Sequence, residues 1–320
     1  MGKYQLFSSS TTYKINVEYH HFQNKKLINI NLNELTFSSD AFLCHIITCG
    51  MPQFYCTNQI NKSRFNEMMY KIYLVINALE ADDEGYLTVS DNIKYLDSSE
   101  KSFISYSIGM FITKLISGED KNFAYDYLVH LSIVKKYKKI NMSGRQEPDL
   151  IGFKRNSNEY AIFEAKGRSR QIETGALQNA KAQIKSINCI SSLKPTIGIV
   201  CVTHPIRAGE RIICSMYDPE LNTRDMVKIR KEEMIYLYYL PVYELIKERG
   251  NGQAQCIIPI NNRSYCIRMP ESLYDFFSEY DEFSKLTVNV GKKLNEIIQA
   301  ISKNSVDSGD DLIFFAAVED

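Results

Sequence analysis

Two acidic residues and one lysine near the middle of the chain have the types and spacing that metal-assisted chemistry needs. Asp149 follows Pro148 in the stretch PDLIGFKRNSNEYAIFEAKGR, which also contains Glu164 and Lys166. Two carboxylates that share a site can bind one hard cation such as Mg²⁺. The main-chain carbonyl of Ala165, between the two charged side chains, offers a further oxygen ligand. This combination predicts metal-assisted hydrolysis of a phosphodiester bond.

A β-hairpin is expected to bring these residues together. Residues 150–153 and 159–166 predict two short strands, which are separated by a polar turn. Side chains two residues apart on a strand share a face, so Glu164 and Lys166 should converge. The hairpin would return Asp149, at the start of the first strand, towards them.

Each of these residues has an expected role. A metal bound here would polarise the phosphate and lower the pKa of a bound water. The Lys166 ammonium would orient the nucleophile and offset charge that develops in the transition state. Asp149, Glu164 and Lys166 are therefore the candidate catalytic residues. Asp149, Glu164 and the Ala165 carbonyl are the candidate metal ligands, with Mg²⁺ as the expected cofactor and Mn²⁺ as its substitute.

The same residues resemble the PD-(D/E)xK nuclease superfamily, which has the restriction-endonuclease-like fold. A predicted helix precedes the motif, and a predicted helix and strand follow it. The stretch is similar to uncharacterised bacterial members that read roughly PDLIG and EAKGRS. The resemblance covers about residues 104–220, and its further matching elements are Leu128-Val129-His130 and Lys181-Ala182-Gln183.

This resemblance implies a fold and a function. It implies a mixed four-stranded sheet flanked by helices, dependence on Mg²⁺ and a substrate that is usually DNA. Many bacterial members serve in restriction or anti-phage defence. The expected fold class is α/β with α+β flanks. The expected parts are a β-rich N-terminal region at residues 1–95, a nuclease-like core at 96–249 and a C-terminal α+β region at 250–320.

Hydrophobic periodicity gives the remaining elements. Alternating apolar residues predict strands between residues 4 and 60, and further strands are predicted at 196–202, at 211–217 and in a hairpin at 256–269. Helices are predicted at residues 64–80, 104–117, 121–139, 177–187, 226–249 with a break at Pro241, and 286–303.

A further acidic ligand is expected from the helix before the hairpin, as is common in the superfamily. Glu119, Asp120 and Asp126 are the candidates, and Glu119 is preferred. An acidic helix start favoured by the helix dipole is the alternative for Glu119. His130 would share a helical face with Asp126 and contact a phosphate or support a metal ligand. A hydrogen-bonded histidine at the edge of the core is the alternative.

Polar and basic residues around the motif are candidates for substrate contact. Gln183 is expected to hydrogen-bond the metal site or the substrate backbone, with a solvated helix face as the alternative. Residues 135–185 contain 12 basic and five acidic side chains, an excess that would hold a phosphate backbone. The residues expected to contact nucleic acid are Arg145, Arg168, Arg170 and Lys181.

Composition sets outer limits. Lys and Arg together number 38, as do Asp and Glu, so any attraction to nucleic acid must come from a local patch. The eight cysteines form no CxxC pair and are expected to be reduced. With neither a secretory signal nor an apolar membrane span expected, the predicted location is the cytoplasm.

Two functions from different classes remain open at this point. The first is a Mg²⁺-dependent endodeoxyribonuclease that acts on double-stranded DNA. Because cutting both strands with one site per chain needs two subunits, a homodimer or a larger defence complex is expected. The second is a catalytically silent nuclease-like fold that binds nucleic acid or serves as a scaffold subunit. RNA is a third possible substrate.

Overall fold

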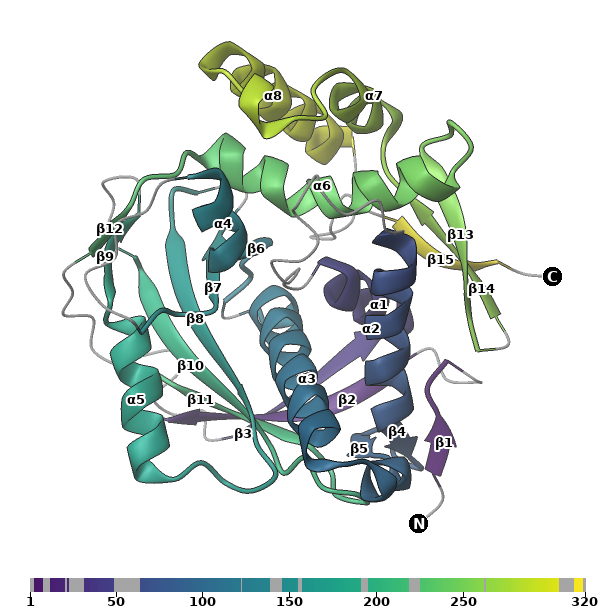
Figure 1. Cartoon of the computed structure of the whole chain (residues 1–320), viewed down its shortest axis with the longest axis vertical. Coiled ribbons are helices and arrows are strands. Elements are labelled where there is room, and N and C mark those ends of the chain that lie inside the picture. The colour runs from purple at the N-terminus through teal and green to yellow at the C-terminus, as the bar shows by residue number, and fades with distance from the viewer. Residues whose placement is uncertain are drawn as a thin grey trace.

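The computed structural model describes a mixed α/β protein in which helices pack around a curled sheet (Figure 1). The α/β fold class expected from the sequence is confirmed at this level. The described residues are 3–7, 12–20, 22, 32–48, 64–121, 123–138, 146–154, 157–190, 195–218, 225–261, 263–304 and 314–318.

The largest sheet contains the hairpin that was expected to carry the site. Its strand order is β3 (Leu32–Ser38), β2 (Thr12–His20), β11 (Ile213–Tyr217), β10 (Ile197–His204), β8 (Tyr160–Gly167), β7 (Leu150–Phe153) and β6 (Tyr127–His130). Strand β8 pairs in parallel with β10 and antiparallel with β7. The sheet has seven strands instead of the expected four, because β11, β2 and β3 extend it beyond β10.

Strands β2 and β3 join this sheet although they come from the expected N-terminal region. Tyr13, Ile15 and Val17 alternate along β2 and are buried, as their spacing predicts. Strand β2 then pairs in parallel with β11, so the sheet crosses the boundary expected near residue 95. Helix α1 (Ser39–Thr48) also lies in this region, whereas the sequence pattern predicts strands there.

Helix α3 (Ser98–Glu119) is the long helix that packs on the carboxyl end of β8. It begins with a capping box, in which Asp97 accepts from the N–H of Glu100 at 2.8 Å and Glu100 accepts from the N–H of Asp97 at 3.0 Å. Helix α2 (Arg64–Ala78) lies against α3. Figure 1 shows α3 and α5 (Thr174–Ile184) on two sides of β8.

The prediction of a single helix at residues 121–139 is wrong. Tyr127–His130 form strand β6, which pairs antiparallel with β7, and only Leu131–Tyr137 form a helix, α4. Tyr127, Leu128 and Val129 are all buried, because an edge strand covered by helices can bury successive side chains on both faces.

The break expected at Pro241 is also wrong. Helix α6 runs from Lys231 to Arg249 with Pro241 inside it. A proline there removes one backbone hydrogen bond of the helix. Most side chains of α6 are buried, and this burial offsets the lost bond.

The other elements surround this core. A small sheet contains β1 (Lys3–Gln5), β4 (Leu79–Asp82) and β5 (Leu87–Val89), a two-stranded sheet contains β9 (Ile187–Ile190) and β12 (Asp225–Val227), and a C-terminal sheet contains β13 (Gln255–Ile260), β14 (Arg263–Arg268) and β15 (Phe314–Val318). The remaining helices are α7 (Glu271–Glu279), α8 (Val288–Asn304) and the 3₁₀ turns η2 (Asp91–Tyr95) and η3 (Phe283–Lys285). Among the described helices, none combines the length and the apolar character that a membrane crossing requires.

Candidate metal centre

The β7–β8 hairpin places Asp149 directly across from Glu164. Leu150 pairs with Phe163, so the next step of the register brings Asp149 opposite Glu164. The main-chain N–H of Asp149 donates to Oε2 of Glu164 at 3.1 Å. The N–H of Ala165 donates to Oδ2 of Asp149 at 2.9 Å. Each carboxylate is thus held by the main chain of the opposite strand, in the arrangement that the sequence predicts.

Glu164 is fully buried, and this burial controls its charge. Its side chain has no exposed surface, although it lies near the end of β8. Burial, and after it the neighbouring charge of Asp149, raises the pKa of the Glu164 carboxyl to about 8. A cation beside the pair would favour the ionised form, and Lys166 already acts in this direction.

The Lys166 ammonium contacts Oε1 of Glu164. The two side chains leave the same face of β8, as their spacing predicts, and Lys166 keeps 22% of its side chain exposed. Lys166 therefore connects the buried carboxylate to the surface. This places a positive charge between the buried acid and the surface.

Two glycines fix the end of the strand that carries Lys166. A Cβ on Gly167 would lie 1.8 Å from the carbonyl oxygen of Ser105, and a Cβ on Gly109 would lie 2.6 Å from the nitrogen of Gly167. Helix α3 and strand β8 therefore meet backbone to backbone. No larger residue fits at either position without moving the helix away from the site.

The oxygen ligands available here suit a hard divalent cation. In a strand, the N–H and C=O of one residue point to the same side. The Ala165 carbonyl therefore points to the side on which the Ala165 N–H donates to Asp149. Among the described residues, no group of three or more His, Cys, Asp or Glu side chains is placed to hold a metal ion. Mg²⁺ needs fewer, since one or two carboxylates with waters and substrate phosphates commonly hold it.

His130 lies at the end of β6 and next to the acidic pair, not on a helix with Asp126. Its Nδ1 accepts from the N–H of Ser132 at 3.1 Å and caps α4, so the neutral ring carries its proton on Nε2. Nε2 lies 3.3 Å from the hydroxyl of Tyr106. Burial lowers the pKa of His130, the charge of Asp149 opposes this, and Lys71 lowers it further. His130 thus couples electrostatically to Asp149.

Gln183 supports the chain segment that leads into the site. Its side-chain amide donates to the carbonyl oxygen of Glu147 at 2.8 Å. Glu147 precedes Asp149 by two residues, so this bond from α5 helps to set where the hairpin begins. The contact favours the role of a positioning residue over a solvated helix face.

The predicted basic residues do not all lie together. Arg168 and Arg170 are exposed in the loop that follows Lys166. The Lys181 ammonium instead lies 5.8 Å from the centre of the Tyr217 ring, on β11. Arg145 lies outside the described residues. Lys166 and the two exposed arginines that follow it, Arg168 and Arg170, are here called the positive rim.

Glu119 does not lie at this site, so the prediction that it is a further metal ligand is wrong. Glu119 ends α3 instead of starting a helix, and its Oε1 lies 2.7 Å from Nε2 of His45. Gly109 marks where α3 crosses β8, and ten residues of helix span about 15 Å. The other two candidates also lie elsewhere: Asp120 hydrogen-bonds Tyr19, and the carbonyl of Asp126 accepts from Lys114.

Sequence reasoning missed the residues that α2 and α3 contribute beside the site. Tyr106 contacts His130, and the charge of Lys71 acts on the same ring. The only signal in the sequence was a pair of aromatic residues, Phe103 and Tyr106, three apart on a helix that is otherwise apolar on another face. Comparisons of the chain with protein-family models, characterised proteins and solved structures found no match.

Proposed function

We propose that this protein is a metal-dependent nuclease that hydrolyses phosphodiester bonds. The observation that carries the proposal is the pair of facing carboxylates, Asp149 and Glu164, with Lys166 on the same strand face. A buried acid next to a second acid is unfavourable by itself and becomes favourable when a cation joins them.

The arrangement of elements supports a restriction-endonuclease-like core. Helix α3 is followed by β6, by the short helix α4 and by the β7–β8 hairpin, in which β7 is antiparallel to both β6 and β8. Helix α5 comes next, and after β9 the chain enters β10, which is parallel to β8. Strands β6, β7, β8 and β10 form a mixed sheet, with a helix before the hairpin and a helix and strand after it. This is the order that the resemblance to PD-(D/E)xK nucleases implies.

The chain's own residues divide the work. Asp149, Glu164 and the carbonyl of Ala165 would hold Mg²⁺ or Mn²⁺. The bound cation would supply a Lewis acid for the phosphate and a water with a lowered pKa. Lys166 would orient the nucleophile and stabilise negative charge on the phosphate oxygens. Gln183 would keep the segment before Asp149 in place through Glu147.

DNA is the proposed substrate, and the rim of Lys166, Arg168 and Arg170 supports binding of a phosphate backbone. A homodimer or a larger defence complex in the cytoplasm would let two sites act on two strands. Restriction or anti-phage defence is the biological role that the resemblance favours.

Cleavage of supercoiled plasmid tests this proposal. The wild-type protein should nick or linearise DNA with Mg²⁺ or Mn²⁺, and Lys166→Ala should reduce the rate by at least about 100-fold, as expected for loss of a group that stabilises transition-state charge. Lys154→Ala is the matched control, because Lys154 pairs with Glu159 at the far end of the same hairpin. Equal activity of wild type and Lys166→Ala with every metal, on DNA and on RNA, would refute the catalytic role.

A second function is favoured by one observation. The contact between Lys166 and Glu164 partly compensates the burial of the acid without a metal, which would let the fold bind nucleic acid or act as a scaffold. Calorimetry with Mn²⁺ separates the two functions. The nuclease requires an affinity that Asp149→Ala removes, whereas the silent fold would show no such affinity even with DNA present.

A further inference from the structure

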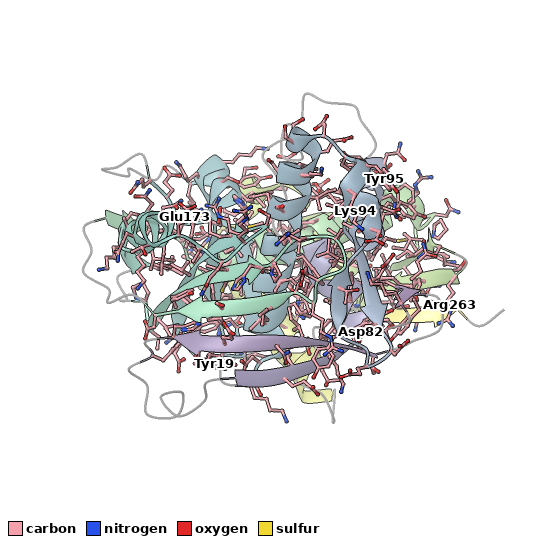
Figure 2. The ribbon with its side chains drawn as sticks, turned by 90° about the horizontal axis from the view of Figure 1, so that it is seen from below. Tyr19, Asp82, Lys94, Tyr95, Glu173 and Arg263 are labelled. Atoms are coloured by element: carbon pink, nitrogen blue, oxygen red, sulfur yellow. The ribbon has the colours of Figure 1, made fainter. Side chains whose placement is uncertain are left out.

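Exposed aromatic side chains gather on one part of the described surface. The four exposed aromatic residues are Tyr70, Tyr95, Phe103 and Tyr106, on α2, η2 and α3. Figure 2 views the protein from below and labels Tyr95 and Glu173, which precedes α5, on opposite sides of the view. A group of exposed aromatic side chains leaves a large apolar area in water, and such areas mark interaction sites.

Three of these rings form a continuous surface, here called the aromatic platform and defined as Tyr70, Phe103 and Tyr106. The rings of Tyr70 and Phe103 are stacked, with centroids 6.3 Å apart and planes inclined by 22°. Phe103 and Tyr106 are three residues apart on α3 and therefore neighbours on one helix face. The exposed fractions are 59% for Tyr70, 40% for Phe103 and 43% for Tyr106.

The aromatic platform continues directly into the candidate metal centre. The Tyr106 hydroxyl lies 3.3 Å from Nε2 of His130. The next residue along the chain from His130, Leu131, donates its N–H to the carbonyl oxygen of Asp149 at 2.8 Å. On the other side, Ser105 touches the backbone at Gly167. A ligand lying on the aromatic platform would therefore reach the carboxylate pair.

Positive charge borders the same surface. Lys71 follows Tyr70 on α2, and its charge acts on His130. Lys166 and Arg168 flank Gly167, where β8 meets α3. The ligand that suits this combination has flat apolar faces and a negatively charged backbone. A nucleic acid has both, but in a duplex the base faces are covered by neighbouring bases.

We infer that the aromatic platform binds unpaired bases and that the substrate of this protein is single-stranded nucleic acid or the unpaired segment of a duplex. Bases stack on Tyr70, Phe103 and Tyr106, while Lys71, Lys166 and Arg168 hold the phosphates that lead to Asp149 and Glu164. The direction towards the scissile bond rests on the proposed nuclease function, whereas the binding of bases does not.

Binding without metal tests the aromatic platform by itself. A fluorescein-labelled oligo(dT) of 20 nucleotides, an oligo(U) of the same length and a 20-base-pair duplex would be titrated with protein in EDTA by fluorescence anisotropy. Phe103→Ala and Tyr70→Ala should each weaken binding of the single strands roughly tenfold, as loss of one stacked base predicts. Duplex binding should change less than twofold. Tyr106→Phe keeps the ring and should bind as the wild type, whereas Tyr106→Ala should not.

Tyr95→Ala is the matched control, because Tyr95 is 88% exposed but is not part of the aromatic platform. Thermal melts of each variant would show that the fold is intact. Wild-type affinity of Phe103→Ala and Tyr70→Ala for both single strands would overturn the inference. So would an equal loss of duplex binding, or a Phe103→Ala variant that changes only the oligomeric state in gel filtration.

The same variants distinguish this inference from the proposed function. If single strands bind through the aromatic platform in EDTA but no nucleic acid is cut with Mg²⁺ or Mn²⁺, the nuclease proposal fails and the platform stands. The opposite result is that plasmid is cut and Lys166→Ala is inactive, while the aromatic substitutions leave the affinity for oligo(dT) and oligo(U) unchanged. That result would support the nuclease proposal and refute the role of the aromatic platform.

Discussion

Asp149 and Glu164 hold each other across the β7–β8 hairpin. The N–H of Asp149 donates to Glu164, and Asp149 accepts from the N–H of Ala165, so each acid is fixed by the main chain beside the other. Main-chain hydrogen bonds fix the position of both carboxylates. The pair is therefore preorganised. Its cost lies in the burial of Glu164 beside the half-buried Asp149, and this cost can be measured through the protonation of Glu164.

Glu164→Gln removes a group that titrates, so the free energy of unfolding of this variant should depend less on pH than that of the wild type. The pKa of Glu164 is about 8 in the folded protein and near 4.3 in an unfolded chain, so the folded state holds the proton more tightly. Its contribution to the free energy of unfolding is fully present below the unfolded pKa and is lost as pH rises towards 8, by at most about 1.4 kcal/mol per pH unit.

Thermal melts in EDTA between pH 5.5 and 8 would measure this effect. The melting temperature of the wild type should fall as pH rises relative to that of Glu164→Gln, which has no proton to lose. Parallel curves for the two proteins would contradict a raised pKa at this position.

Metal affinity should increase with pH over the same range. A cation must displace the proton of Glu164, so Mn²⁺ affinity should rise about tenfold per pH unit below the folded pKa and level off above it. Calorimetry at pH 6, 7 and 8 tests this. Asp149→Asn and Glu164→Gln should each abolish binding, while Glu147→Gln, two residues before Asp149, should keep it. A pH-independent affinity would mean that the cation binds elsewhere.

The hairpin could be predicted from the sequence because its signals are local. Two short strands separated by a polar turn predict the hairpin. Because Asp149 directly precedes the first residue of β7, Leu150, the hairpin brings Asp149 opposite Glu164. Strand β6 was missed because its three apolar residues and His130 directly precede an amphipathic helix and were assigned to that helix. Only its pairing with β7, which no local pattern encodes, makes it a strand.

Long-range packing explains the other differences. Glu119 was preferred because the superfamily often takes a further acidic ligand from the helix before the hairpin. The direction of α3 across β8 instead carries Glu119 towards His45. The same crossing brings Tyr106 and Phe103 to the site. That crossing is set by contact between Gly109 and Gly167, which are far apart in the chain and have no shared motif.

Filling this glycine contact should destabilise the protein. Alanine at Gly167 would place a Cβ against the carbonyl of Ser105, and the clash with backbone atoms cannot be relieved by a side-chain rotation. We expect a loss of about 3 kcal/mol in urea unfolding for Gly167→Ala. Gly175→Ala, in the first turn of α5 and with no atom within 4 Å of the new Cβ, should be neutral or stabilise by up to about 1 kcal/mol. Equal stability of both variants would argue against the close packing of α3 on β8.

The salt dependence of binding should identify the cations that contact the backbone. Each phosphate contact to a single strand contributes about 0.7 to the slope of log affinity against log salt concentration. Arg168 and Arg170 are exposed beside Lys166, so Arg168→Ala and Arg170→Ala should each lower the slope for oligo(dT) by up to about 0.7. Arg268 is an exposed arginine on strand β14 of the C-terminal sheet, and Arg268→Ala should leave the slope unchanged. The slope would be measured by anisotropy titrations at salt concentrations between roughly 50 and 300 mM, where log affinity is linear in log salt concentration. An unchanged slope in both loop variants would remove these arginines from the binding path and leave Lys71 and Lys166 to carry the phosphates.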